Sequence, residues 1–169
     1  MNEMYAEWLV KRKPPAYTML LKIVMGILCV IAFFLSMYPA LGIFGMLILL
    51  AAVGATYFVF RNSQVEYEYL YVSNTLSIDQ IYGKSKRKKA WEGSMEGVRI
   101  VAPTGSIEAR DHENGTMKVL DFSSRVPGAK TYTLISQSGA ETTKIIFEPN
   151  DKLLTCMRMT APRKVIKAV

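Results

Sequence analysis

The chain has 169 residues, enough for one ordinary domain and a membrane segment, and it carries a net charge of +7. Half of its residues are hydrophobic, and they concentrate between residues 17 and 60, where Lys22 is the only charged side chain. Two cysteines, Cys29 and Cys156, are too few for a disulfide framework, which excludes a small disulfide-stapled secreted domain.

Residues 1–16 form the first predicted element, an amphipathic helix at the membrane interface. Apolar residues recur there with helical spacing: Met4, Tyr5, Trp8 and Leu9. Three cations follow them: Lys11, Arg12 and Lys13. Aromatic residues at headgroup level beside basic residues are typical of an interfacial helix, so we expect Trp8 and the three cations to contact lipid. The alternative is a short helix that packs on the soluble domain.

Residues 17–60 predict a transmembrane hairpin of two helices. Residues 23–37 are apolar apart from Ser36, and residues 41–60 carry no charge. Each span is about 20 residues and about 30 Å long, the thickness of a hydrocarbon core, and Pro39 favours a tight turn between them. A buried hairpin of a soluble protein is the alternative, but residues 41–60 lack a polar face. A signal peptide is disfavoured because a second full span follows the first.

The charges around the hairpin predict its orientation. The turn between the spans carries no charged residue, whereas both outer flanks carry Lys and Arg. Basic flanks stay on the cytoplasmic side, so we expect a cell-membrane protein with two spans and both termini in the cytoplasm.

Small residues predict how the two spans meet. They occur along both helices: Gly26, Ala32, Ser36, Gly42 and Gly45. An antiparallel arrangement about Pro39 pairs Ser36 with Gly42, Ala32 with Gly45, and Gly26 with Ala51 or Ala52. Small residues allow helix backbones to approach closely in lipid. The alternative is that Gly and Ala are simply common in membrane helices.

Residues 65–169 predict a soluble, mainly-β domain. Its first strand alternates, with three tyrosines on one face (Tyr67, Tyr69 and Tyr71) and Glu66 and Glu68 on the other, which we expect to face solvent. Further strands are expected at residues 76–82, 88–92, 98–102, 117–122, 131–136 and 143–147, with a short strand at residues 107–110. Asn150 is the expected N-cap of a terminal amphipathic helix that ends at Pro162.

This element order predicts the fold class, a membrane α-helical hairpin plus a mainly-β (α+β) soluble domain. About seven strands followed by one amphipathic helix is the order of a pleckstrin-homology-like barrel, in which the helix plugs one open end of two orthogonal sheets. The alternative is an unrelated β-sheet with a covering helix.

Several segments also carry a resemblance to a known family. They are Glu7-Trp8-Leu9-Val10-Lys11-Arg12-Lys13-Pro14, Val65-Glu66-Tyr67-Glu68-Tyr69, Ile78-Asp79, Ile81-Tyr82-Gly83-Lys84-Ser85-Lys86-Arg87-Lys88, Asp121-Phe122-Ser123-Ser124, Phe147-Glu148-Pro149-Asn150 and Ala161-Pro162-Arg163-Lys164-Val165. These resemble small two-span membrane proteins of Gram-positive bacteria, a family of unknown function. The resemblance covers nearly the whole chain and implies a membrane location and a bacterial source, but no mechanism.

A basic run that begins after the second predicted strand of the domain and extends into the third is the leading candidate site. Its members are Lys84, Lys86, Arg87, Lys88 and Lys89. In pleckstrin-like folds an early basic hairpin loop often meets lipid headgroups, so this run could contact the anionic inner leaflet. The alternative is a solvated loop that only reinforces the inside-positive topology. Nucleic acid is a weaker interpretation, since basic clusters that flank a membrane segment more often concern topology and lipid.

Other side chains give weaker signals. The tyrosines, with Tyr82 and Trp91, could form a stacking platform, but alternating aromatics on a strand more often pack across strands. Glu66 and Glu68 have no nucleophile beside them. His112 is the only histidine, and one histidine with two distant cysteines cannot assemble a usual zinc site, so we expect no metal, cofactor or catalytic residues.

The sequence therefore predicts a membrane-anchored, non-enzymatic binding or scaffold module. Its cytoplasmic domain would contact anionic lipid or a protein partner, with an unidentified membrane protein as a further candidate and no nucleic acid. The alternative is a structural subunit of a larger membrane assembly that acts through the transmembrane hairpin. An enzyme of an unfamiliar type is a third hypothesis.

Overall fold

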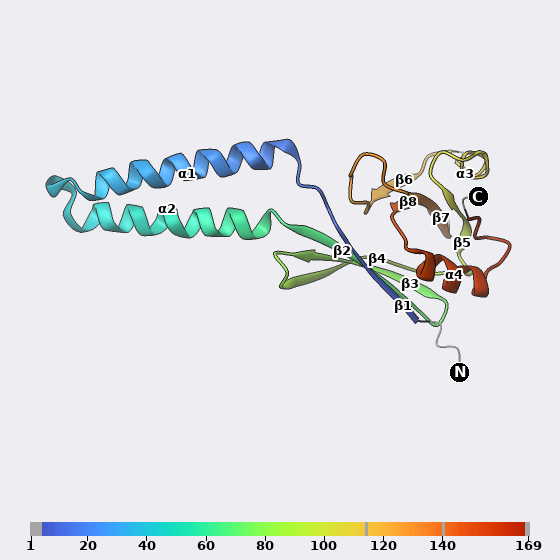
Figure 1. Ribbon diagram of the computed structural model, residues 1–169. Coiled ribbons are helices and arrows are strands. Elements are labelled where there is room, and N and C mark those ends of the chain that lie inside the picture. The colour runs from blue at the N-terminus through green and yellow to red at the C-terminus, as the bar shows by residue number, and fades with distance from the viewer. Residues whose placement is uncertain (1–4, 114, 140, 168–169) are drawn as a thin grey trace. The chain divides into compact units, whose positions relative to one another are not determined.

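The computed structural model describes residues 5–113, 115–139 and 141–167, and the chain forms two compact units (Figure 1). The helical unit consists of Pro14–Val65 together with Tyr82–Ser85, and the β unit contains the rest of the described chain. Each unit is described by itself below.

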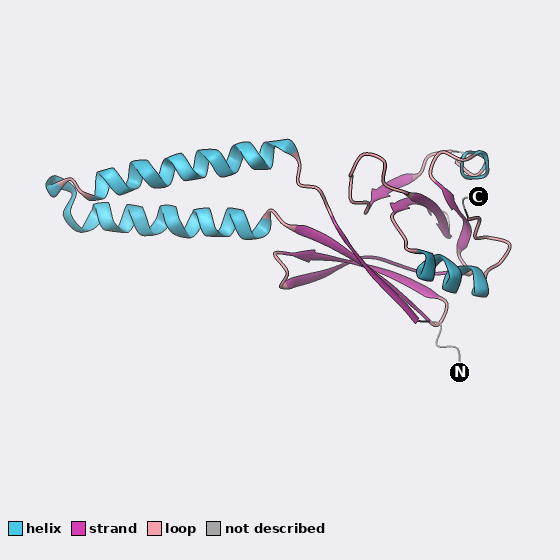
Figure 2. Cartoon of the chain, viewed as in Figure 1, coloured by secondary structure: helices cyan, strands magenta, loops and turns pink. Residues whose placement is uncertain are grey.

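The helical unit contains two long helices, α1 (Ala16–Ser36) and α2 (Gly42–Asn62), joined by a short 3₁₀ turn, η1 (Pro39–Leu41) (Figure 2). Both helices are long and apolar enough to cross a membrane, and most of their side chains are exposed. A core helix of a soluble protein would bury its apolar side chains instead. The predicted helical hairpin is therefore present, with its turn after Pro39 as expected.

The two helices pair about one turn further along α2 than predicted. A Cβ added at Gly45 would lie 2.9 Å from the Cα of Ser36, so Ser36 meets Gly45 and not Gly42. Cys29 Sγ lies 3.1 Å from Thr56 Oγ1, and Lys22 Nζ lies 5.1 Å from the centroid of the Phe60 ring. The reason for the shift is η1, which inserts a further turn between the helices before α2 begins.

Close packing of small residues is therefore confined to part of the predicted set. Ala32 is buried, and Gly45 approaches the backbone of α1. The predicted roles of Gly26 and Gly42 are wrong, because in the described part of the chain nothing lies within 4 Å of a Cβ added at either position. Gly42 serves the turn instead, since its φ of +45° is unfavourable for other residues.

The β unit contains two four-stranded sheets. The first runs in the order β1-β2-β3-β4, with β1 (Tyr5–Lys11), β2 (Val65–Val72), β3 (Thr75–Tyr82) and β4 (Lys86–Ser94). The second runs in the order β5-β7-β8-β6, with β5 (Val98–Pro103), β6 (Lys118–Asp121), β7 (Tyr132–Ser138) and β8 (Glu141–Phe147). The sheets are not closed into one barrel, and the described residues hold eight strands where about seven were predicted.

Two further helices belong to the β unit. The first, α3 (Ile107–Asp111), replaces the short strand predicted at residues 107–110, because the Ser106 side chain accepts a hydrogen bond from the Ala109 N–H and caps a helical turn. The second, α4 (Asp151–Thr160), is the predicted terminal helix: Asn150 Oδ1 accepts a hydrogen bond from the Leu153 N–H at 2.8 Å. It buries Leu153, Leu154 and Met157.

The N-terminal segment is a strand, so the predicted interfacial helix of residues 1–16 is wrong for the part that the structure describes; residues 1–4 lie outside it. Strand β1 pairs antiparallel with β2 over seven residues, from Tyr5 opposite Val72 to Lys11 opposite Glu66. Ala6 and Val10, which share one face of the strand, are buried. Pairing with β2 therefore outweighs the short helical pattern, and the predicted domain of residues 65–169 lacks its first strand.

The helical hairpin is thus an insertion between the first two strands of the β unit. Across this insertion β1 flanks the three tyrosines of β2, which are buried. Packing across neighbouring strands was predicted for them, but the ring of Tyr67 packs edge-to-face against Phe122 in the loop after β6, and that of Tyr69 against Phe147 of the second sheet. The Tyr69 hydroxyl donates to the Phe122 carbonyl at 2.7 Å, and the Tyr71 hydroxyl donates to Thr160 Oγ1 at 2.9 Å. Burial raises the pKa of Tyr69, so this hydroxyl stays protonated and holds β2 to the second sheet.

The insertion can be tested by replacing residues 14–64 with a four-residue linker that contains an Asn-Gly turn. We expect a water-soluble, monomeric β unit with a cooperative thermal unfolding transition, because β1 and β2 then form an ordinary hairpin. Deleting residues 1–13 from the same variant should abolish the transition, since it uncovers Tyr67, Tyr69 and Tyr71. Circular dichroism and size-exclusion chromatography measure both outcomes. A stable domain without β1 would contradict the insertion.

The helix contact can be tested with Gly45→Leu in the full chain. The added side chain would clash with the α1 backbone at Ser36. We therefore expect the free energy of unfolding to fall by about 1–3 kcal/mol and the melting temperature in detergent to be lower. Gly26→Leu is the matched control and should leave the melting temperature nearly unchanged. Equal effects of the two substitutions would show that close approach at Gly45 does not stabilise the hairpin.

Candidate functional site

The antiparallel order of the first sheet gathers the two predicted basic clusters of the β unit. In the order β1-β2-β3-β4, the last residues of β1 and the first residues of β4 lie at the same end of the sheet. This end, called the basic end below, carries Lys11, Arg12, Lys13, Lys86, Arg87, Lys88 and Lys89. The chain also enters β2 there, directly after α2.

The turn between β3 and β4 carries Lys84 and belongs to the helical unit. Gly83 and Lys84 have φ values of +54° and +59°, and the Ser85 N–H donates to the Tyr82 carbonyl at 3.1 Å. Positive φ at both central residues is the type I′ geometry that suits the twist of a two-residue hairpin. Lys84 therefore sits at the tip of the hairpin and is exposed.

This turn is held on the last turn of α2, a contact that the sequence did not predict. The Gly83 N–H donates to the Gln64 carbonyl at 2.9 Å, and Arg61 Nη2 donates to Ser85 Oγ at 2.7 Å. A Cβ added at Gly83 would lie 2.8 Å from both Cγ and O of Arg61, so only glycine fits. The run Tyr82-Gly83-Lys84-Ser85 is typical of a turn, but it does not predict that Arg61 contacts this turn.

The cations of β4 divide into paired and unpaired groups. Arg87 Nη2 lies 2.9 Å from Glu68 Oε1, and Lys89 Nζ lies 2.8 Å from Glu92 Oε2. Lys86 and Lys88 are exposed and have no ion pair among the described residues. Strand alternation puts Lys86 and Lys88 on the face of the sheet opposite to Arg87. Two of the predicted lipid-contacting residues are thus engaged within the domain, and two are free to contact a ligand.

Glu68 explains why Arg87 is engaged. Glu66 and Glu68 were expected to face solvent, but they are only 8% and 5% exposed, because β2 lies inside the sheet with a strand on each side. Burial raises the pKa of Glu68, the nearby Arg87 lowers it, and the carboxylates of Glu7 and Asp79 raise it further. Arg87 is therefore the cation that makes a buried carboxylate tolerable on this face.

The N-terminal cluster is also partly structural. Arg12 Nη1 donates to the Tyr67 hydroxyl at 2.5 Å, and the guanidinium carbon lies 5.8 Å from the centroid of the same ring. The Lys13 N–H donates to the Ser124 carbonyl at 2.7 Å, and Lys11 stands opposite Glu66 in the strand register. Trp8, opposite Tyr69 on β1, is 41% exposed, so its indole is accessible although no interfacial helix carries it.

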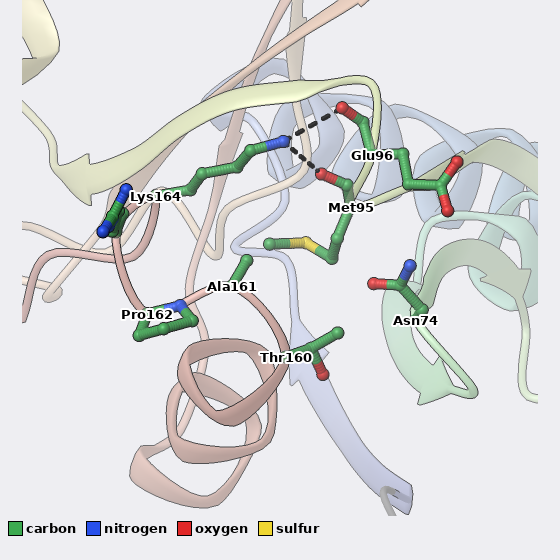
Figure 3. Close-up of a pocket in the computed structure, with 8 residues that line it drawn as sticks. Asn74, Met95, Glu96, Thr160, Ala161, Pro162 and Lys164 are labelled. Atoms are coloured by element: carbon green, nitrogen blue, oxygen red, sulfur yellow. Dashed lines mark hydrogen bonds between the residues drawn. The ribbon is translucent and has the colours of Figure 1, made fainter.

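The opposite end of the β unit holds a cavity of about 290 Å³ (Figure 3). It is lined by the β2–β3 turn, the β4–β5 turn and the segment after α4, through Asn74, Met95, Glu96, Thr160, Ala161, Pro162, Arg163 and Lys164. Lys164 Nζ donates to the carbonyls of Met95 and Glu96 at 2.9 and 3.0 Å, while Asn74 Oδ1 is buried with no partner among the described residues. The polar groups that line the cavity can form hydrogen bonds with a ligand, and the lining includes no histidine or cysteine.

His112 and its acidic neighbours lie elsewhere, at the end of α3. His112 Nδ1 lies 3.0 Å from the Glu108 carbonyl oxygen. Within residues 5–113, 115–139 and 141–167, no group of three or more His, Cys, Asp or Glu residues is arranged to hold a metal ion. Cys29 and Cys156 are free thiols in different units.

Comparison with known proteins gives one family. A family model described as a bacterial PH-like domain (DUF6106) matches residues 2–167. The match runs through β1, the helical hairpin and both sheets, so it includes the insertion described above. No curated protein matches the chain.

The Arg87–Glu68 pair can be tested by Arg87→Gln in the hairpin-replaced β unit. The raised pKa of Glu68 means that folding favours its protonated form, so stability falls as the pH rises from the ordinary carboxyl value near 4.5 through the folded-state pKa. Arg87 opposes this rise in the pKa of Glu68. Removing its charge should therefore lower the free energy of unfolding by about 1–2 kcal/mol at pH 7 and by less at pH 5. Urea unfolding measures both values. The control is Lys89→Gln, whose ion pair is exposed and should matter little at either pH.

Proposed function

Since the chain belongs to a bacterial PH-like domain family of unknown function, we propose that it is a membrane-anchored, non-enzymatic binding module whose domain contacts anionic lipid of the inner leaflet. One observation carries the proposal: the sheet order gathers both basic clusters of the β unit at the end where the chain passes to and from the two apolar helices. Cations at the boundary between a membrane span and a cytoplasmic domain contact anionic lipid headgroups.

The strand pairing supports a hairpin that crosses the membrane twice and returns to the same side. Strand β1 precedes the hairpin and β2 follows it, yet the two pair over seven residues of one sheet. This pairing is compatible with two spans, because an even number of spans leaves both flanks of the hairpin on one side of a bilayer. The basic residues on both flanks favour the cytoplasm as that side.

The unpaired cations set the expected strength of the contact. Each basic residue near an anionic leaflet contributes about 1 kcal/mol, and salt screens this over about 8 Å at physiological ionic strength. Lys84, Lys86 and Lys88 have no ion pair among the described residues, so together they could contribute a few kcal/mol. Because the helices already anchor the chain, this energy orients the domain on the lipid surface and does not recruit the protein.

The proposal is tested with the full chain reconstituted in vesicles of phosphatidylcholine, with or without about 30% phosphatidylglycerol. We expect amide hydrogen exchange at residues 84–89 to slow severalfold in the anionic vesicles, and high salt to abolish the difference. Lys84→Gln combined with Lys86→Gln and Lys88→Gln should remove it as well.

The matched control removes the same charge elsewhere, by Lys118→Gln, Lys152→Gln and Arg158→Gln on β6 and α4. These residues are exposed, and the protection at residues 84–89 should survive their substitution. Equal exchange in neutral and anionic vesicles for the unaltered chain would reject lipid as the ligand of the basic end.

A further inference from the structure

A cation inside the first helix points toward the end of the second. Lys22 is the only charged residue between residues 17 and 60, and its Nζ lies 5.1 Å from the Phe60 ring. Phe60 immediately precedes Arg61, so the ammonium of α1 is brought to the level of the basic last turn of α2. A lone cation in an apolar helix is costly unless it reaches the interface or an anion.

Arg61 and the β3–β4 turn add two further cations at this level, which we call the hairpin base. The bond to Ser85 Oγ uses one of the five N–H donors of Arg61 and holds the guanidinium against the turn. Lys84 precedes Ser85 at the tip of that turn. Lys22, Arg61 and Lys84 have no carboxylate partner among the described residues, although every one of them belongs to the same compact unit.

Thr18 provides an independent observation on the same unit. It lies one turn before Lys22 on the same face of α1. Its side chain is only 7% exposed, and its hydroxyl has no hydrogen-bond partner among the described residues. A buried hydroxyl without a partner carries a desolvation cost that an added acceptor would remove.

We propose that the hairpin base binds the phosphate of one anionic phospholipid through Lys22, Arg61 and Lys84, with the Thr18 hydroxyl as a further donor. A phosphate matches this set, because an arginine fork and two ammonium groups are its usual protein partners. The inference rests on the proposed membrane location and deepens it, since it assigns a lipid to a site of its own and not to a diffuse surface.

The helix surface next to Arg61 suits the rest of such a lipid. Tyr57, Val53 and Leu50 lie four, eight and eleven residues before Arg61, so they follow it along one face of α2. All three side chains are exposed and carry no charge. An acyl chain can therefore follow this face while its phosphate stays at the base, which a soluble phosphate cannot do.

The test is native mass spectrometry of the full chain in detergent with added phosphatidylglycerol. We expect one lipid to remain bound to the unaltered chain, and Lys22→Gln with Arg61→Gln to lower the retained fraction about tenfold. Arg61→Lys keeps the charge and should restore much of the binding. Circular dichroism and size-exclusion chromatography check that each variant is folded. Unchanged retention in a folded Lys22→Gln, Arg61→Gln variant would overturn the proposal.

Competing molecules identify the source of the phosphate. Diacylglycerol, which has no phosphate, and zwitterionic phosphatidylcholine should be retained much less than phosphatidylglycerol, and equal retention of either would reject recognition of an anionic headgroup. If millimolar inorganic phosphate displaces the lipid, the hairpin base binds a soluble anion, and the proposal of a phospholipid is overturned.

A matched variant separates this site from the basic end of the β unit. Lys86→Gln with Lys88→Gln should weaken the protection of residues 84–89 on anionic vesicles but leave the retained lipid unchanged. Loss of retained lipid in that variant would contradict a site confined to the hairpin base. If the chain retains the lipid but residues 84–89 show no protection on anionic vesicles, the proposed function of the β unit is rejected and the site at the hairpin base is not.

Discussion

The pairing of β1 with β2 is the constraint on which the rest of the molecule depends. These strands flank the helical hairpin in sequence, yet they pair antiparallel over seven residues. The pairing covers the tyrosines at the centre of the β unit and brings both ends of the hairpin to one end of a sheet. The burial of these tyrosines therefore depends on two strands that the helical hairpin separates in sequence.

At the same end of the sheet, only part of the positive charge takes part in contacts within the domain. Arg12 bonds a buried tyrosine, and Arg87 offsets a buried glutamate, so both guanidinium groups are held by the domain. The lysines at positions 86 and 88 are left exposed and unpaired within the described structure. This division follows side-chain chemistry, because the planar guanidinium fork of arginine suits buried partners, whereas the flexible and strongly hydrated ammonium of lysine suits an exposed position.

Patterns within a segment predicted most of the fold. The uncharged run of residues 41–60, the alternation around Tyr67 to Tyr71 and the Asn150 cap each act locally, and each element formed where expected. The helix predicted for residues 5–11 was wrong because four apolar residues also fit helical spacing, and only pairing with the distant strand β2 selects the strand. The contact of Arg61 with the Gly83 turn and the burial of Glu68 could not be predicted for the same reason: long-range neighbours create them.

The inserted hairpin also has a consequence for biogenesis. Strand β1 leaves the ribosome before either helix, and its partner is not synthesised until both helices have been made. During that interval the exposed aromatic side chains of β1, Tyr5 and Trp8, have no sheet to join. Synthesis of both helices must therefore precede formation of the first sheet, and a chain stalled before β2 is made would present a single unpaired strand prone to association with other nascent chains.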